Sequence, residues 1–298
     1  MKKLTTVIDL AIKQPEFVSF EEFEACVLSS IKSDSLLSAL EIALRVTSIS
    51  QAFSVGYRCA LQCVLPELNQ DSWAAFCVSE AGGSSPKQLQ VSVTSDGIVA
   101  GEKSFVSMAE KAKQLIVIAV AEKSDTRPKL KAVLVSAESQ GVEILTMPNM
   151  GMMPEVSHGR LILKDVKGSV LSGDGYADFN KPFRGIEDTH LLMSFTGLVL
   201  SKVIRNNLNN ELIDQCLLIA SALLAVEFDD NPWSTLQING AYQLFESLLV
   251  TFEKQLNEVS AEFKEQWEKD KKVFSLAKKI RDMKRVSAMK KIHEDLMV

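Results

Sequence analysis

The chain has 298 residues, a formal net charge of −5 and 46% hydrophobic residues. This length allows one large domain or two to three small ones, and the composition is that of a globular protein with a sizeable core. The acidic balance argues against general binding to nucleic acid, so we predict no nucleic-acid partner.

The first region, residues 1–70, reads as a helical domain. Ser19 is placed to cap a helix that begins at Phe20, because carboxylates follow in its first turn, where they favour the helix dipole. One longer helical stripe is predicted next, from the apolar residues Leu36, Leu37, Leu40, Leu44, Ile49, Phe53 and Tyr57. Pro66 marks its exit.

The second region, residues 71–180, reads as a β domain. Apolar and polar residues alternate over 88–94, and Asp96-Gly97 is a strong hairpin signal that leads into a strand at 98–99. Further strand candidates are residues 115–121, 130–135, 142–147 and 160–166. Their spacing predicts an antiparallel barrel or sandwich, without a βαβ rhythm or a dinucleotide-binding fingerprint.

The third region, residues 181–298, reads as a helical bundle. Its predicted segments are an apolar stripe over 191–203 and helices at 212–228, 236–259 and about 263–296. Pro232 separates the second and third of them, and Ser234 is a candidate cap for the third. One side of the last segment is predicted to be lined by Phe274, Ala277, Ile280, Ile292 and Leu296. The fold class is therefore α+β, with helical, β and helical domains in that order.

The last segment also concentrates positive charge. Residues 264–291 contain 11 Lys or Arg and 4 Asp or Glu. This basic stripe is either a solvated helix face or a surface for phosphates or an acidic partner.

The five cysteines are scattered and odd in number, which fits a reducing compartment better than a disulfide framework. Cys59 and Cys63 lie one helical turn apart, but no His or further Cys is near enough in sequence to complete a metal site, so none is predicted. The most apolar run, residues 217–226, is too short to span a bilayer, and the N-terminus lacks a signal-peptide core. We therefore predict a cytoplasmic protein without a membrane span.

Two short segments of the β region carry residues that suit a cofactor. The first, residues 76–85, joins a predicted strand to a turn of small residues, and the second, residues 103–107, follows after one predicted hairpin. Glycines allow close backbone approach, and serine hydroxyls can donate hydrogen bonds. A solvent-exposed turn beside an ordinary strand is the alternative interpretation.

These segments resemble the flavin-contacting pair of the acyl-CoA dehydrogenase family, whose domain order is also helical, β, helical. Ser79 stands in the place of a family Thr and Glu80 matches a family Glu. Phe105 stands in the place of a Trp and Ser107 in the place of a Thr. The chain resembles a divergent member that is shortened at both ends.

The resemblance implies an FAD site on the β domain. The residues that it assigns to the cofactor are Phe76, Val78, Ser79, Gly82, Ser84, Ser85, Phe105, Val106 and Ser107. The hydroxyls of Ser79 and Ser107 would donate to the flavin ring, beside which Phe105 would form an aromatic wall. Ser84 and Ser85 would hydrogen-bond a phosphate or a substrate oxygen.

The chain departs from the family at the catalytic base, so no catalytic residue is identified. The chain ends at Val298, before the loop that usually carries the carboxylate, and the family's other position for it corresponds to Thr189. A missing general base typically costs a factor of about 10² to 10⁴ in rate. His190, beside it, is either a polar contact at the pocket mouth or, as we expect, a capping or surface histidine.

Three functions remain open at this point. The first is an FAD-dependent oxidoreductase of fatty acid metabolism that acts on CH–CH groups of an acyl-CoA or acyl-carrier thioester, within a homo- or hetero-oligomer that supplies the missing parts. The second is a catalytically degenerate member that serves as a structural or regulatory partner, or that binds acyl-CoA or an acyl carrier without turnover. The third is a flavin-dependent monooxygenase of the same fold.

Overall fold

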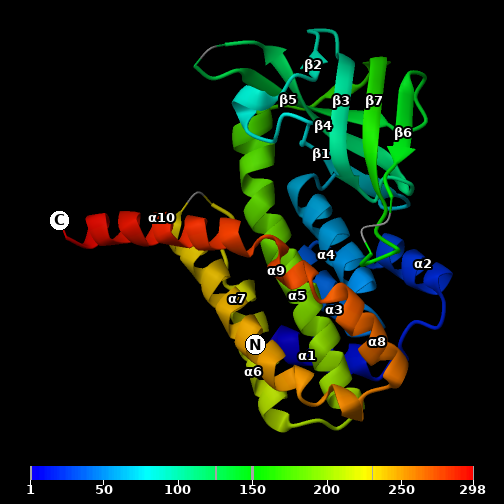
Figure 1. Cartoon of the computed structure of the whole chain (residues 1–298), viewed down its shortest axis with the longest axis vertical. Helices are drawn as coiled ribbons and strands as arrows, with labels where there is room; N and C mark the ends of the chain where they lie inside the picture. Colours follow the sequence, from blue (N-terminus) through cyan, green and yellow to red (C-terminus); the bar gives the residue numbers. More distant parts are fainter. Residues whose placement is uncertain (1, 125, 149–150, 230, 298) are drawn as a thin grey trace. The chain divides into compact units, whose positions relative to one another are not determined.

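The computed structural model describes residues 2–124, 126–148, 151–229 and 231–297. The chain forms two compact units (Figure 1). The helical unit contains Met1–Ala60, Gly151–Met153 and Gly185–Val298, and the β unit contains Leu61–Met150 and Pro154–Arg184. The predicted order of helical, β and helical segments is confirmed, and the helical segments before and after the β region belong to one unit.

The β unit is built on one curled sheet. Its strands are β1 (Trp73–Cys77), β2 (Ser92–Val93), β3 (Ile98–Ser107), β4 (Ala112–Glu122), β5 (Lys129–Ser136), β6 (Val142–Thr146), β7 (His158–Lys167) and β8 (Ser169–Val170). They lie in the order β6-β7-β3-β2-β4-β5-β8, and β1 pairs with β4. Short helical turns cover Pro86–Gln88 and Gly175–Asn180.

The sheet is mixed, whereas the strand spacing alone predicted an antiparallel one. The long pairs β3–β7, β4–β5 and β6–β7 are antiparallel, but β1 and β4 run parallel, with Phe76 opposite Ile116. Leu115, Val117 and Ala119 of β4 join the core cluster of the unit, while Ile116 and Ile118 between them are also fully buried. Burial on both faces explains why this strand appears in the sequence as a continuous apolar run.

The N-terminal helices are α1 (Lys2–Ile12), α2 (Phe20–Ser30), α3 (Ser35–Ala43) and α4 (Ile49–Val64). The predicted cap of α2 is confirmed, because the Ser19 side chain accepts a hydrogen bond from the backbone N–H of Glu22. The single long stripe predicted over residues 36–57 is wrong, since it contains two helices. The hydroxyl of Ser48 accepts from the backbone N–H of Gln51 at 3.1 Å and thereby starts α4 as a separate helix.

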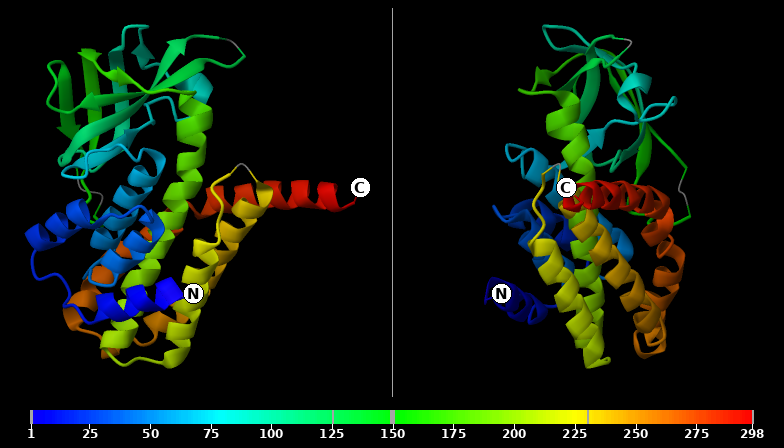
Figure 2. Two further views of the ribbon diagram at one scale, coloured as in Figure 1. Left: turned by 180° about the vertical axis from the view of Figure 1, so that it is seen from behind. Right: turned by 90° about the vertical axis from the view of Figure 1, so that its left-hand side faces the viewer.

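The C-terminal helices are α5 (Lys181–Arg205), α6 (Asn210–Leu224), α7 (Pro232–Glu253), α8 (Ala261–Asp270), α9 (Val273–Leu276) and α10 (Lys278–Leu296), with a short turn at Leu256–Glu258. Asn231, not Ser234, caps α7, because its side chain accepts from the backbone N–H of Trp233, while Ser234 donates to Asp229. Within the helical unit, α6 and α7 pack side by side (Figures 1 and 2).

The last predicted segment divides into α8, α9 and α10, and its predicted apolar side is only partly buried. Ile292 is buried, whereas Ile280 is 58% exposed and Leu296 is 69% exposed. The core of this region is aromatic instead: Trp267 packs against Phe252 and Phe274 at ring-centroid distances of 5.1 and 5.5 Å. No helix in the described part of the chain is long and apolar enough to cross a membrane.

Two glycines of the helical unit should respond oppositely to alanine. A Cβ on Gly56 of α4 would lie 2.8 Å from the carbonyl oxygen of His190 and 2.8 Å from Cα of Leu191, both backbone atoms of α5. Gly56→Ala should therefore lower the free energy of unfolding by about 1–3 kcal/mol, the usual cost of overpacking. A Cβ on Gly240 of α7 meets nothing within 4 Å, so Gly240→Ala should raise the free energy of unfolding by about 0.5–1 kcal/mol.

Urea unfolding of both variants beside the wild type checks this pair. Equal destabilisation by the two alanines would contradict the close approach of α4 and α5 at Gly56.

Candidate functional site

The first candidate segment begins on a buried strand and ends in a tight turn. The ring of Phe76 in β1 packs tilted against that of Phe183 at a ring-centroid distance of 4.2 Å, and burial raises the pKa of the neighbouring Cys77 thiol to about 12. After the strand, the backbone N–H of Glu80 donates to the Gly83 carbonyl at 3.0 Å, and the N–H of Gly83 donates back at 2.9 Å. The chain thus turns sharply right after Ser79.

Gly83, rather than Gly82, is the glycine that this turn requires. Gly83 has a φ of +125°, and a Cβ there would lie 2.5 Å from the side-chain oxygen of Gln88. A Cβ on Gly82 would meet only the Gln88 carbonyl, at an ordinary 3.8 Å. The same Gln88 side chain accepts a hydrogen bond from the hydroxyl of Ser85 at 2.5 Å. That hydroxyl therefore donates within the turn and not to a ligand.

The second candidate segment ends strand β3 with a bulge. The β3–β7 register shifts between Lys103 and Val106, and between them Phe105 has a φ of +54° and a side chain that is 59% exposed. A positive φ is costly for an aromatic residue and is typical of sites where the surrounding structure holds a side chain in place for a function. The bulge turns Phe105 outward while Val106 remains in the core.

A buried lysine joins the two segments. The ammonium group of Lys103 donates to Glu80 Oε1 at 2.6 Å and to the Val78 carbonyl at 3.0 Å. The Lys103 side chain is 0% exposed and that of Glu80 is 7% exposed. The next residue continues the connection, since the backbone N–H of Ser104 donates to the Ser79 carbonyl at 2.7 Å. The structure therefore brings the two predicted segments into direct contact.

Both carboxylate oxygens of Glu80 accept hydrogen bonds within the β unit. Its Oε2 accepts from the backbone N–H of Gln90 at 2.6 Å, and its Oε1 also accepts from that of Val91 at 3.1 Å. Burial lowers the pKa of Lys103, and the hydrogen bond that its ammonium group donates to Glu80 opposes that effect. All of these hydrogen bonds are made within the β unit. The ion pair therefore acts as a structural clamp that holds the turn after Ser79 against strand β3.

The predicted cofactor residues differ in whether their side chains are accessible to a ligand. Phe76 and Val106 are buried, so only their backbone is available to a ligand. The hydroxyls of Ser79, Ser84 and Ser107 are half-buried and have no hydrogen-bond partner among the described residues. Unpartnered hydroxyls together with the exposed ring of Phe105 fit the donor and aromatic groups that a flavin requires.

Sequence reasoning matched Glu80 to the family but missed the role of Lys103. The signal was present in the strand period, because Lys103 lies four residues after buried Val99 and so faces the same side of β3. In the described ranges, no cluster of His, Cys, Asp or Glu could hold a metal ion.

The helical unit contains Thr189 and His190 on α5, and both are buried. Thr189 donates its hydroxyl to the Gly185 carbonyl at 2.8 Å, one turn earlier in the helix. His190, expected at a cap or on the surface, is instead in the core, where its ring stacks on Phe228 at a centroid distance of 5.8 Å. The surface expectation failed because α5 is buried on several sides at this point.

Comparisons with known proteins agree with this architecture. Residues 75–166 match the family model of the acyl-CoA dehydrogenase middle domain. A search of curated proteins gave no match. The butyryl-CoA dehydrogenase of Megasphaera elsdenii is 12% identical with a TM-score of 0.72, and the alignment covers 97% of this chain and 98% of that one.

Two further solved structures share the fold. A prolyl acyl carrier protein oxidase is 13% identical with a TM-score of 0.68, covering 98% of each chain. A structure described as PigA with FAD and proline is 12% identical with a TM-score of 0.63, covering 88% of this chain and 87% of that one. At these identities the likeness shows the fold alone. The middle-domain match covers residues 75–166, and the whole chain shares the fold of the butyryl-CoA dehydrogenase, so the chain is similar to the acyl-CoA dehydrogenase family in both respects.

Proposed function

We propose that the chain binds FAD on its β unit and acts as an oxidoreductase on the CH–CH group of an acyl thioester. The observation that carries the proposal is the contact between the two predicted segments, made by Lys103 with Val78 and Glu80. This contact fixes backbone segments that carry unpartnered hydroxyls and an exposed aromatic ring. Solved structures of the same fold include a butyryl-CoA dehydrogenase and a prolyl acyl carrier protein oxidase, which supports a thioester substrate.

Each residue of the site has a separate part in this proposal. Ser79 and Ser107 donate hydroxyl hydrogen bonds to acceptors of the flavin ring, and Phe105 covers its side. The ion pair of Glu80 and Lys103 keeps the turn after Ser79 in one conformation without touching the cofactor. Bound FAD would supply the hydride acceptor that amino-acid side chains cannot provide.

The flavin proposal is tested by incubating the purified chain with FAD, removing unbound cofactor and recording the visible absorption spectrum. The wild type should retain FAD. Ser79→Ala should bind it roughly 2- to 10-fold more weakly, which corresponds to one hydrogen bond. Ser169→Ala, at an exposed serine of β8 in the same sheet, is the matched control and should bind like the wild type.

Failure of the wild type to take up FAD would reject a flavin site. Equal affinity of Ser79→Ala and Ser169→Ala would instead reject the assignment of Ser79 while leaving FAD binding intact.

One observation favours a second function, that of a family member that binds acyl thioesters without oxidising them. Thr189, at the family's alternative base position, cannot accept a proton as a carboxylate does, and its hydroxyl is held inside α5. The neighbouring carboxylate of Asp188 is engaged by Lys284 at 3.5 Å. Anaerobic addition of acyl-CoA to the FAD-loaded chain separates the two functions, because only an oxidoreductase bleaches the oxidised-flavin band. Calorimetric binding of acyl-CoA without bleaching would support the second function.

A further inference from the structure

The last helix exposes an apolar face to solvent. Ile280, Met283 and Val286 are 58%, 66% and 70% exposed, at a helical spacing of three residues. They lie on the side of α10 opposite to Ala288 and Ile292, which are buried. The far half of α10 extends past α7, beyond the other helices of its unit (Figures 1 and 2).

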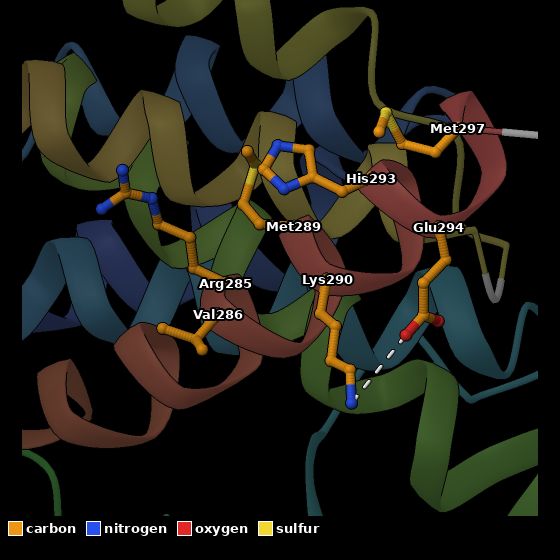
Figure 3. Close-up of a pocket in the computed structure, with 7 residues that line it drawn as sticks. All are labelled: Arg285, Val286, Met289, Lys290, His293, Glu294 and Met297. Atoms are coloured by element: carbon orange, nitrogen blue, oxygen red, sulfur yellow. Dashed lines mark ion pairs between the residues drawn. The ribbon is translucent and has the colours of Figure 1, made fainter.

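Two shallow, open depressions lie along this face. One, of about 880 Å³, is lined by residues that include Lys279, Met283 and Val286. The other, of about 670 Å³, is drawn in Figure 3, where Val286 and Met289 lie along α10 with Met297 further toward its end. Both depressions share Val286 and Lys290, so they form one continuous surface, which we call the α10 face.

The helix that carries the α10 face has an excess of positive charge. Residues 276–297 contain seven Lys or Arg and three Asp or Glu, in a chain whose net charge is −5. Some of these cations are neutralised, since Lys278 pairs with Glu246 and Lys290 with Glu294. Lys279, Arg285 and Lys291 are exposed and form no ion pair within the described part of the chain. Uncompensated positive charge thus borders exposed apolar side chains.

We propose that the α10 face docks an acidic amphipathic helix of a partner protein. Apolar residues at helical spacing on the partner would cover Ile280, Met283 and Val286, and its carboxylates would meet Lys279 and Lys291, which lie on or beside the same side of the helix. A second copy of α10 fits less well, because it would bring another excess of positive charge to the same place. A membrane surface also fits less well, because the exposed apolar residues include none of the aromatic side chains that anchor interfacial helices.

The proposal is tested with two synthetic helical peptides and the full-length chain, by fluorescence anisotropy. Both peptides carry Leu along one face; the other positions are Glu in the first and Lys in the second. The Leu/Glu peptide should bind, more weakly as salt is raised, and the Leu/Lys peptide should not. Val286→Glu should weaken binding by about tenfold or more, as expected at the centre of an interface. Leu218→Glu, at an exposed leucine of α6, is the matched control and should leave binding unchanged.

Absence of binding, equal binding of the two peptides, or a Val286→Glu variant that binds like the wild type would each overturn the proposal. Light scattering tests whether a second copy of the chain covers the α10 face instead, and vesicle sedimentation tests whether a membrane does. A dimer that Val286→Glu converts to a monomer would show that the face belongs to a second copy. Binding to phosphatidylcholine–phosphatidylserine vesicles that Val286→Glu abolishes would show that it belongs to a membrane.

Discussion

Replacement of Lys103 by methionine should lower the free energy of unfolding by about 3–5 kcal/mol, the usual cost of removing one partner from a buried ion pair. Methionine is unbranched and apolar, so it fills much of the same space without a charge. Glu80 would keep its hydrogen bonds from the backbone of Gln90 and Val91 but would lose its only cation among the described residues. Urea unfolding of the purified variant, followed by circular dichroism, measures the loss.

The interaction itself is isolated by a double-mutant cycle. Glu80→Gln removes the negative charge and retains an oxygen that accepts hydrogen bonds, so in the wild-type background it leaves Lys103 buried without a counter-charge. In the Lys103→Met background the same change should cost less, because no buried charge remains unpaired. Additive effects of the two changes would show that the charges do not stabilise each other.

Strand β3 provides a control at the adjacent residue. Glu102 accepts a hydrogen bond from Arg160 at 2.6 Å, the same separation as in the buried pair, but both of these side chains are exposed. Water screens this pair, so Glu102→Gln should change stability far less than Lys103→Met. Equal losses from the two variants would mean that burial is not the cause.

Most strands and helices were predictable because their apolar residues recur with a clear period or, as in β4, form a continuous run, whereas the short strand β8 was not predicted. The hairpin at Asp96-Gly97 was also predictable, since Gly97 adopts a φ of +83° that glycine accepts readily. The break between α3 and α4 was not, because the apolar stripe continues across it and only the capping bond of Ser48 interrupts the helix. The parallel pairing of β1 with β4 was not predictable either, since strands that are far apart in the sequence give no local signal of their pairing.

The candidate site was predictable as two segments but not as one structure. Serines and glycines at family positions identified residues 76–85 and 103–107. The bulge at Phe105 depends on the register between β3 and β7, which no property of residue 105 determines. The strand period places Lys103 on the same side of β3 as Val99, but it does not show that the ammonium group is enclosed, because a lysine in a strand is more commonly found at the surface. Both features therefore depend on packing between segments that are far apart in the sequence, which the local residue pattern does not show.

Burial of His190 fixes the protonation of its ring. The Nδ1 atom lies 2.7 Å from the Ile186 carbonyl, which only accepts, so Nδ1 carries the proton. In the neutral ring Nε2 is then an acceptor, and the Ser35 hydroxyl, 2.9 Å away, donates to it. The hydroxyl oxygen could also accept from a protonated Nε2, but that second proton would place a positive charge in the buried core. Burial accordingly lowers the pKa of His190 from 6.5 to about 4.

This lowered pKa should make the native state less stable in acid. Below pH 6.5 the histidine of the unfolded chain takes up a proton, while native His190 stays neutral down to about pH 4. The stabilisation is therefore complete above pH 6.5 and is lost as the pH falls toward 4, with a slope of up to about 1.4 kcal/mol per pH unit and a total of about 3 kcal/mol.

His190→Asn retains a side-chain N–H donor for the Ile186 carbonyl but cannot titrate. Its free energy of unfolding should therefore fall less steeply than that of the wild type over this pH range, when both are measured by urea unfolding. The carboxylates that also titrate in acid are common to both proteins and cancel in the difference. Parallel curves for the two proteins would mean that His190 is protonated in the native state as readily as in the unfolded chain.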